Sequence, residues 1–593
     1  MSGKVRIAGL ASVNTFTVRL VITVVVAVSL QISSGQLPFG HLGGFGGGVH
    51  TNGALHGNLP SFSTASHAAT IFCGTCAYKD ACIGSIGSMV NNPNANPKDF
   101  FQAAIQSSIS QVSTVLNVSG SIAASSSGSK KMFMEDCQEL LGFAVDELHA
   151  CFSTVGGTDL NVFRNKQAEL LNWLSAVVSY QHTCLDGIFD SQLKTEIMSN
   201  GLSAANQLAS NALAIVSTIG GKEGGFGFKF TKNSHGESTV GTGSRRLKEV
   251  YQSNGEPSWL SGEDRKLLGG NNGNGNLTPN KVVAKDGSGD FKTIGEALSS
   301  YPKNHQGRYT IYVKAGIYNE YLTVTKEQVN VFIYGDGPRK TIITGRKNFN
   351  EGVSTFRTAT FSAIGKGFVA KSIGFQNTAG PEGHQAVALR VQSDMSAFYN
   401  CRIDGYQDSL YVQTHRQFYH NCVISGTVDF IFGDAAAVIQ NSLIIVRKPG
   451  KNQKNAVTAQ GRVDQYESTG IVIQNCRIVP EQKLISERLT TPTYLGRPWK
   501  EYSRTVIMES TIEDLIQPAG WMEWDGDFAL NTLYYAEYAN RGPGAATNQR
   551  VKWKGYKVIT NRNEAMQFTA GQFLQGNLWL GNTGAPFFLG LKH

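Results

Sequence analysis

Hydrophobic and polar residues alternate in two different ways along this chain, and the change divides it into parts. Over about residues 66–218, apolar residues recur every three or four positions, the period of an amphipathic helix. Within 134–151 one such face is formed by Leu140, Leu141, Ala144, Val145 and Leu148. The same pattern predicts helices at about 165–179 and 185–214. From about residue 281 onward, short β-type runs separated by turn residues replace it.

An asparagine that follows a short apolar run recurs in the strand-rich part, at Asn377, Asn400, Asn421, Asn441 and Asn475. The first four are 23, 21 and 20 residues apart. A unit of about 20 residues with short strands is typical of a parallel β-solenoid. A β-sandwich also has many short strands, but its turns recur every 8 to 12 residues or so and need no common register. The repeat therefore favours the solenoid.

The remaining segments carry targeting and linker signals. Residues 20–30 are an apolar run behind basic residues and before small ones, which predicts a signal peptide within 1–35 or an uncleaved signal anchor. Either sends the chain into the secretory pathway, where disulfides form. Residues 36–65 are a glycine-rich spacer, and 219–277 read as a linker between the helical part, 66–218, and the solenoid, 278–593.

Short motifs add processing and modification sites to this plan. The linker contains two basic pairs that a protease could reach, Arg245-Arg246 and Arg265-Lys266. The sequences NVS at Asn117 and NLT at Asn276 are potential glycosylation sites. Six of the nine cysteines lie in the helical part, and an even number there predicts disulfides whose connectivity counting leaves open: Cys73, Cys76, Cys82, Cys137, Cys151 and Cys184.

The net charge of +9 lies entirely in the strand-rich part. From residue 278 onward there are 35 basic and 26 acidic residues, against 18 of each before it. A basic surface favours an anionic partner. We expect no nucleic acid, because the chain has no Lys/Arg-rich run and no nucleic-acid-binding motif.

The solenoid period also brings candidate chemistry together. Asp408 and Asp429 are 21 residues apart, and Gln385 and Gln407 are 22 apart, so each pair stacks on neighbouring coils about 4.8 Å apart. Two adjacent carboxylates cannot both ionise freely, which offers one nucleophile and one acid, and an arginine held against one of them would keep it charged. Glutamine amides suit a transient oxyanion. The structural alternative is an amide ladder with solvated acids.

The strings GYQDSLYV (405–412), GTVDFIFG (426–433), LGRPW (495–499) and GHQAVALR (383–390) resemble the signature blocks of plant pectin methylesterases. The resemblance implies a right-handed parallel β-helix that hydrolyses the C6 methyl ester of homogalacturonan with no metal or other cofactor. It makes Asp429 the nucleophile and Asp408 the acid and then the base, with Gln385 and Gln407 at the oxyanion and Arg497 paired with Asp429. Substrate contacts are implied for Thr355, Gln385, Tyr411, Phe432, Arg497, Trp499 and Trp521.

The helical part resembles the pectin methylesterase and invertase inhibitor family, in the spacing of Cys73 and Cys82, in DCQELLGFAVDEL (136–148) and in TCLDG (183–187). That resemblance implies a four-helix bundle with disulfides Cys73–Cys82 and Cys137–Cys184. Cys76 and Cys151 are additional and could pair with each other.

Together the two parts resemble a group I pectin methylesterase, whose pro-region silences the enzyme until cleavage at RKLL (265–268) or RRLK (245–248). The partners implied are pectin, the chain's own pro-region or separate inhibitor proteins, and a processing protease. We expect a secreted monomer of the plant cell wall.

The solenoid departs from that family at Ser442, where the family has a cysteine, which leaves Cys401, Cys422 and Cys476 without an assignable pairing. Cys401 and Cys422 could bridge adjacent coils. Two other functions stay open from the residues alone: another β-helical pectin-degrading enzyme, a lyase or polygalacturonase, or an inhibitor or wall-binding protein with an inert solenoid.

Overall fold

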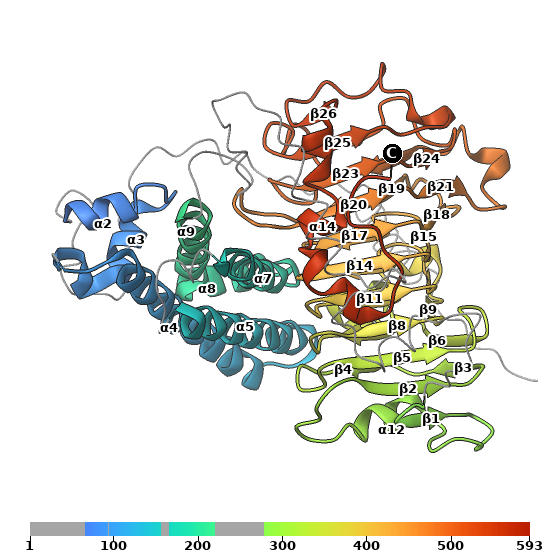
Figure 1. Cartoon of the computed structure of the whole chain (residues 1–593), viewed down its shortest axis with the longest axis horizontal. Coiled ribbons are helices and arrows are strands. Elements are labelled where there is room, and N and C mark those ends of the chain that lie inside the picture. The colour runs from blue at the N-terminus through green and yellow to red at the C-terminus, as the bar shows by residue number, and fades with distance from the viewer. Residues whose placement is uncertain (1–65, 93, 156–164, 220–277, 593) are drawn as a thin grey trace, which may run out of the picture. The chain divides into compact units, whose positions relative to one another are not determined.

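The computed structural model describes residues 66–92, 94–155, 165–219 and 278–592. Helices fill the first three ranges, and the fourth consists mainly of parallel strands (Figure 1). All of them belong to one compact unit of the chain. Within these ranges, no helix combines the length and the apolar character needed to cross a membrane. The predicted signal segment, glycine-rich spacer and linker lie outside the described residues.

Four long helices pack against one another in a closed bundle around their own hydrophobic core. They are α4 (Pro97–Ala124), α5 (Gly128–Val155), α7 (Gln167–Asp186) and α9 (Ser203–Ile219), with the shorter α2 (His67–Phe72), α3 (Lys79–Ile86) and α8 (Ser191–Ile197). A capping box starts α4, where the Asn96 side chain accepts hydrogen bonds from the backbone of Lys98 and Asp99, and Asp99 accepts one from the backbone of Asn96. The predicted four-helix bundle is confirmed.

The single helix predicted over 185–214 is wrong. The chain instead ends α7 at Asp186, starts α8 after the N-cap Asp190, and turns again before α9. At that second turn Gly201 has φ 123°, a conformation that residues with a Cβ rarely adopt, and a Cβ there would lie 2.1 Å from the Gln111 side chain. The apolar period continues through both turns because α8 and α9 both bury apolar side chains in the bundle core.

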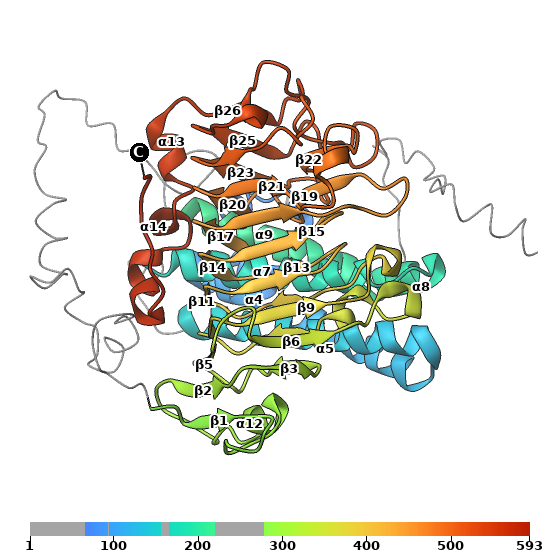
Figure 2. The same cartoon turned by 90° about the vertical axis from the view of Figure 1, so that its right-hand side faces the viewer.

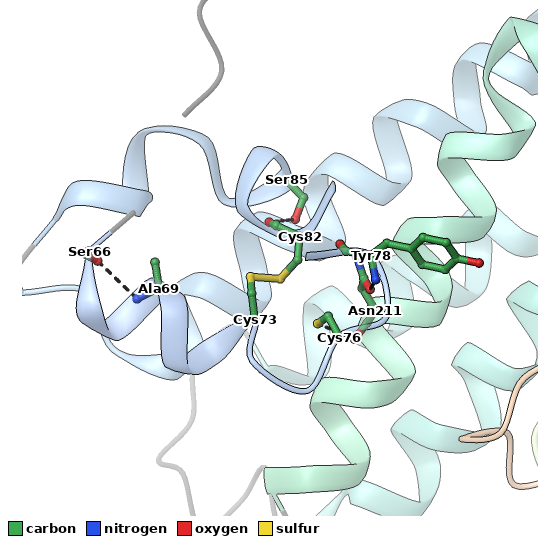
Figure 3. Close-up of a disulfide and its surroundings, with 8 residues drawn as sticks. All are labelled: Ser66, Ala69, Cys73, Cys76, Tyr78, Cys82, Ser85 and Asn211. Atoms are coloured by element: carbon green, nitrogen blue, oxygen red, sulfur yellow. Dashed lines mark hydrogen bonds between the residues drawn. A yellow bond between two sulfur atoms is a disulfide. The ribbon is translucent and has the colours of Figure 1, made fainter. Parts of the chain in front are cut away.

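Two disulfides tie the bundle, and both are the predicted ones. Cys73–Cys82 joins the end of α2 to α3 (Figure 3), and Cys137–Cys184 joins α5 to α7. The pairing considered for Cys76 and Cys151 is wrong, because both are buried free thiols. Cys76 lies beside α9, where its Sγ is 3.8 Å from the carbonyl oxygen of Asn211.

The strand-rich part coils into three parallel sheets, in which every strand pairs with the equivalent strand of the next coil (Figure 2). The eleven-stranded sheet contains β1 (Lys281–Val283), β2 (Tyr309–Val313), β5 (Val331–Gly335), β8 (Val369–Lys371), β11 (Ser396–Tyr399), β14 (Arg416–His420), β17 (Ala436–Gln440), β20 (Gly470–Gln474), β23 (Arg504–Met508), β25 (Tyr534–Tyr538) and β26 (Tyr556–Val558).

The other two sheets complete each coil. The seven-stranded sheet contains β4 (Leu322–Val324), β7 (Phe361–Ala363), β10 (Leu389–Val391), β13 (Leu410–Val412), β16 (Ile431–Gly433), β19 (Asn455–Gln460) and β22 (Thr493–Gly496). The eight-stranded sheet contains β3 (Gly316–Asn319), β6 (Thr341–Gly345), β9 (Gly374–Asn377), β12 (Arg402–Asp404), β15 (Val423–Gly426), β18 (Leu443–Val446), β21 (Arg477–Pro480) and β24 (Thr511–Ile512). The predicted right-handed parallel β-helix is confirmed.

The asparagine repeat marks one corner of the solenoid, with one correction. Asn400, Asn421, Asn441 and Asn475 each follow a strand of the eleven-stranded sheet and have φ between 52° and 54°. This left-handed turn suits asparagine, whose side chain bonds locally. Asn377 belongs instead to β9, and the residue one coil below Asn400 is Ser372, which accepts a hydrogen bond from Asn400 at 3.0 Å.

The cysteines of the solenoid follow that corner into its core. Adjacent coils place Cys401, Cys422, Ser442 and Cys476 in successive positions, because the residue after each is in register with its neighbours. All three cysteines are buried free thiols, so the bridge considered between Cys401 and Cys422 is absent. The stack fills the corner with small side chains, and the Ser442 hydroxyl accepts a hydrogen bond from the backbone N–H of Cys422.

The ends and the outer face of the solenoid are covered by short helices. Helix α12 (Ile294–Ser299) packs on β1 and β4 at the first coils. The C-terminal segment, with α13 (Arg562–Met566) and α14 (Ala570–Phe573), buries the outer face of the eleven-stranded sheet (Figure 2). The cleft that contains the candidate site lies along the seven-stranded sheet, beside β13 and β16.

Candidate active site

Successive coils bring the two predicted aspartates together beside the seven-stranded sheet. Asp408 lies two residues before β13 and Asp429 two residues before β16, and Leu410 of β13 is in register with Ile431 of β16. Gln407, the residue before Asp408, forms a parallel β-bridge with Gln385 on the preceding coil. Asp408 and Asp429 have φ of 62° and 50°, an uncommon conformation for residues other than glycine that tends to occur at functional sites.

A cavity of about 320 Å³ lies over these residues. It is lined from the solenoid by Thr355, Phe356, Gln385, Gln407, Asp408, Tyr411, Asp429, Phe432, Arg497, Trp499 and Trp524, among others. The structure therefore brings together every predicted site residue of the solenoid except Trp521.

The Arg497 guanidinium forms a bidentate ion pair with the Asp429 carboxylate. Nε donates to Oδ1 at 2.9 Å and Nη2 donates to Oδ2 at 2.7 Å. Arg497 directly follows β22, and its own backbone N–H is held by the carbonyl oxygen of Thr458 at 3.0 Å. A bidentate pair of this kind fixes the orientation of Asp429.

Asp408 has the opposite environment. It is 7 % exposed, and burial raises the pKa of its carboxyl well above the ordinary value, with the neighbouring Asp429 charge raising it further and Arg497 opposing both. The two carboxyl groups therefore differ, since Asp429 is paired with a guanidinium whereas burial favours the protonated form of Asp408.

The amide of Gln385 is available for a ligand. Its Oε1 is buried and accepts no hydrogen bond from any described residue. Its backbone is fixed, since the next residue, Ala386, donates its N–H to the carbonyl oxygen of Gln407 at 3.2 Å. Oε1 can only accept a hydrogen bond, so the group that suits an oxyanion formed during reaction is the NH2 of the same amide, a neutral donor.

Aromatic rings form the walls of the cleft. Tyr411 and Phe432 stack with their centroids 4.3 Å apart, and Trp499 meets Phe432 edge-on at 5.9 Å. Trp524 is 36 % exposed and lies over the Arg497 guanidinium at 4.3 Å. Such faces suit the apolar sides of sugar rings.

The prediction for Trp521 is wrong. Its ring is 1 % exposed within the solenoid core, tilted against Tyr535 with the ring centroids 4.3 Å apart, and its Nε1 donates to Glu537. The residue that lines the cleft is Trp524, three positions later in the same string GWMEWDG. Sequence reasoning also missed Phe356, which lines the cavity beside the predicted Thr355 and stacks against Arg390 at 3.6 Å.

The helical bundle supplies the rest of the cavity wall, from Asp136, Leu140, Thr183, Asp186, Gly187 and Phe189. The Thr183 hydroxyl lies 3.3 Å from that of Tyr411. Asp186 pairs with Lys500, next to Trp499, and Ser179 donates to the carbonyl oxygen of Gln413 at 3.1 Å. No sequence signal pointed to these contacts, because they join residues more than 200 positions apart.

The predicted glycosylation and processing sites are not among the described residues that line this cavity. Asn117 is exposed on α4. Asn276 and the basic pairs Arg245-Arg246 and Arg265-Lys266 lie outside the described residues.

Comparison with known proteins agrees with this geometry. The family model for Pectinesterase matches residues 280–577, and that for Plant invertase/pectin methylesterase inhibitor matches residues 69–215. Pectinesterase 2 of Arabidopsis thaliana is 44 % identical over 545 residues, which cover 90 % of this chain and 92 % of the relative. Pectinesterase 1 of Citrus sinensis is 47 % identical over 471 residues, 78 % of this chain and 77 % of the relative.

A solved structure extends the likeness to the fold. The pectin methylesterase from carrot is 57 % identical, with a TM-score of 0.53, over 53 % of this chain and 99 % of the carrot chain. These matches favour an esterase over the lyase, polygalacturonase and inert-solenoid alternatives. The chain belongs to the pectinesterase family: it is a carboxylic ester hydrolase that acts on the methyl esters of pectin and carries an inhibitor-like helical bundle ahead of its catalytic solenoid.

Proposed function

We propose that the solenoid hydrolyses the C6 methyl ester of galacturonate through a covalent acyl-enzyme on Asp429. A carboxylate oxygen of Asp429 attacks the ester carbonyl carbon, and the carbonyl oxygen takes up the negative charge within reach of the Gln385 and Gln407 amides. The tetrahedral adduct collapses as the protonated Asp408 gives its proton to the methoxy oxygen, and methanol leaves. The galacturonate acyl group is then joined to Asp429 as an anhydride.

The second half returns the enzyme to its starting state. Asp408, now a carboxylate, removes a proton from water while the hydroxide oxygen attacks the acyl carbon. The bond to Asp429 breaks, Asp429 returns to its pair with Arg497, and Asp408 keeps the proton for the next cycle. The product is a galacturonic acid that ionises in solution. The observation that carries this proposal is the split pair, with Asp429 held by two hydrogen bonds from Arg497 beside a buried Asp408 of raised pKa.

Methanol release by the solenoid fragment 278–593 tests the mechanism. The fragment is expected to fold alone, because its main core draws only on solenoid residues and half of this chain matches nearly the whole carrot enzyme. Asp429→Asn should lower kcat by at least about 10³-fold, as expected when a covalent nucleophile is removed. The matched control is Asp514→Asn, which breaks a similar bidentate pair, with Arg488, away from the cleft. Full activity of Asp429→Asn would rule out the acyl-enzyme.

We further propose that the bundle keeps the enzyme silent by occupying the substrate cleft. Its support is the set of bundle side chains in the cavity wall, with Thr183 at Tyr411 and Asp186 at Lys500. A sugar ring stacked on the cleft aromatics would overlap these side chains. Cleavage of the linker at Arg265-Lys266, or at Arg245-Arg246, would let the bundle leave.

This regulation fits an exported wall enzyme. We propose that the chain is secreted, is processed by a protease that recognises basic pairs, and acts as a monomer on pectin in the plant cell wall. The cavity contacts suggest that separate inhibitor proteins of the same family would bind the processed enzyme in the same way. The test compares methanol release by the full chain before and after linker cleavage, with a variant in which Arg245, Arg246, Arg265 and Lys266 are all replaced by Gln as the uncleaved control. Equal activity before and after cleavage would refute inhibition by the bundle.

A further inference from the structure

One contact between the bundle and the solenoid differs from the rest because it uses both oxygens of a single carboxylate. The Ser354 hydroxyl donates to Oδ2 of Asp136 at 2.6 Å, and Nε of Arg357 donates to Oδ1. The neighbouring Glu135 also pairs with Arg357, at 3.2 Å. Asp136, Ser354 and the intervening Thr355 line the same cavity as the catalytic aspartates.

The solenoid holds this pair of donors in place by itself. Ser354 immediately precedes the 3₁₀ turn Thr355–Thr358, and its carbonyl oxygen accepts hydrogen bonds from the backbone N–H groups of Arg357 at 2.8 Å and Thr358 at 3.1 Å. The turn therefore sets a hydroxyl and a guanidinium side by side. With the bundle docked over it, Ser354 is 3 % exposed.

The contact is a poor device for attaching the bundle. Burial raises the pKa of the Asp136 carboxyl, although Ser354 and Arg357 act against it. A carboxylate taken out of water in this way returns little net binding energy even when it is well paired. The placement of the two donors, Ser354 and Arg357, is better explained by a ligand carboxylate that they would bind when the bundle is absent.

We propose that Ser354 and Arg357 form a carboxylate-binding subsite of the cleft, which takes the free carboxylate of an already demethylated galacturonate near the scissile ester, and that Asp136 imitates this group in the uncut chain. The inference rests on the proposed function of the solenoid. Ser354 and Arg357 precede β7, two coils before β13, which follows Asp408, so the subsite lies about 10 Å along the solenoid axis from the reacting group. That distance is longer than one pyranose residue, so the subsite takes a residue beyond the immediate neighbour, and the enzyme prefers esters that have an acid close by on the same polymer.

Kinetics of the fragment 278–593 on two defined substrates test the subsite. Fully methyl-esterified oligogalacturonate lacks the carboxylate, and partly de-esterified oligogalacturonate carries it. Arg357→Gln should raise KM for the second substrate about 10-fold, the effect of losing one charged hydrogen bond, with kcat unchanged and KM for the first within about two-fold. Ser354→Ala should act in the same direction, and Arg357→Lys should recover part of the loss. The matched control, Arg477→Gln, removes an exposed arginine of β21 and should change neither KM.

A binding measurement separates the subsite from the reaction. In the Asp429→Asn background, calorimetric affinity for unesterified oligogalacturonate should fall about 10-fold on adding Arg357→Gln. Equal changes of KM on both substrates, or an unchanged affinity, would overturn the subsite. If the unaltered fragment releases no methanol from either substrate, the proposed function fails, while the affinity measurement still decides whether the subsite exists.

Discussion

Docking of the bundle on the solenoid should weaken as the pH rises, through a buried histidine between them. His415 is 4 % exposed, with its Nε2 at 3.1 Å from Oε1 of Glu147 on α5. From α7, Asn172 lies at 3.1 Å from Nδ1 and the Tyr180 hydroxyl at 3.4 Å from Nε2. Because these partners come from the bundle, undocking would remove them from the imidazole.

The balance of these groups fixes the sign of the pH dependence. Burial lowers the pKa of His415, but Glu147 and, more weakly, Asp394 outweigh burial and the opposing Arg416 charge, so the pKa in the docked chain lies above 6.5. Protonation therefore favours docking. The contribution is complete below the ordinary histidine pKa and is lost as the pH rises through the docked value.

Glu147→Gln tests this reasoning, because it removes the charge and keeps the shape. A hydrogen bond to a charged group contributes about 1.5–3 kcal/mol, so the dissociation constant of the bundle at pH 5 should rise about 10- to 100-fold. At pH 8 a smaller fraction of His415 is protonated in the docked chain, so the change should be smaller. The measurement uses the full chain cut at a protease site placed in the linker, with release of the bundle followed at both pH values.

The residue before Glu147 supplies the control. Asp146 pairs with Lys326 across the same interface, but both side chains are 52 % exposed, so Asp146→Asn should change docking by less than about 1 kcal/mol at either pH. A Glu147→Gln effect of equal size at pH 5 and pH 8 would show that His415 does not carry the pH dependence.

Three further outcomes follow from the site and the bundle. Trp524→Ala should raise KM for pectin several-fold with little change in Tm, whereas Trp521→Ala should cost about 3–5 kcal/mol of stability, and the reverse pattern would refute the assignment of Trp524 to the cleft. Replacing Cys137 and Cys184 by alanine opens a bridge with a sequence separation of 47, and urea unfolding should show the bundle about 4 kcal/mol less stable with the solenoid transition unmoved. Because Asp408 must be protonated to release methanol, kcat should fall as the pH rises through its raised pKa, and a profile that already falls near pH 4 would contradict that role.

The sequence could predict the catalytic pair because a solenoid turns distance along the chain into distance in space. One coil separates Asp408 from Asp429, so counting residues was enough to stack them. The same counting misplaced Asn377, since a strand-end asparagine in a different sheet gives nearly the same interval. Period alone does not say which corner of the coil a residue occupies.

Burial was harder to predict than position. Trp521 and Trp524 lie three positions apart in the same string GWMEWDG, and only the packing of Trp521 on Tyr535 decides which ring is in the core. The break between α7 and α9 was missed for a similar reason, since the apolar period runs on while Gly201 turns the backbone. In both cases the local hydrophobic pattern fits either outcome, and the tertiary structure decides between them.

The contacts between bundle and solenoid were beyond sequence reasoning, yet they limit how the chain can vary. Tyr411 stacks in the sugar cleft and also meets Thr183, and Arg357 would bind a substrate carboxylate and also holds Asp136. A substitution of Tyr411 or Arg357 that frees the enzyme from its bundle would therefore also weaken the binding of pectin. Release without such a loss has to come from solenoid contacts outside the cleft such as His415 with Glu147, from changes on the bundle side, or from cutting the chain between the two parts, which is the step that the basic pairs of the linker would provide.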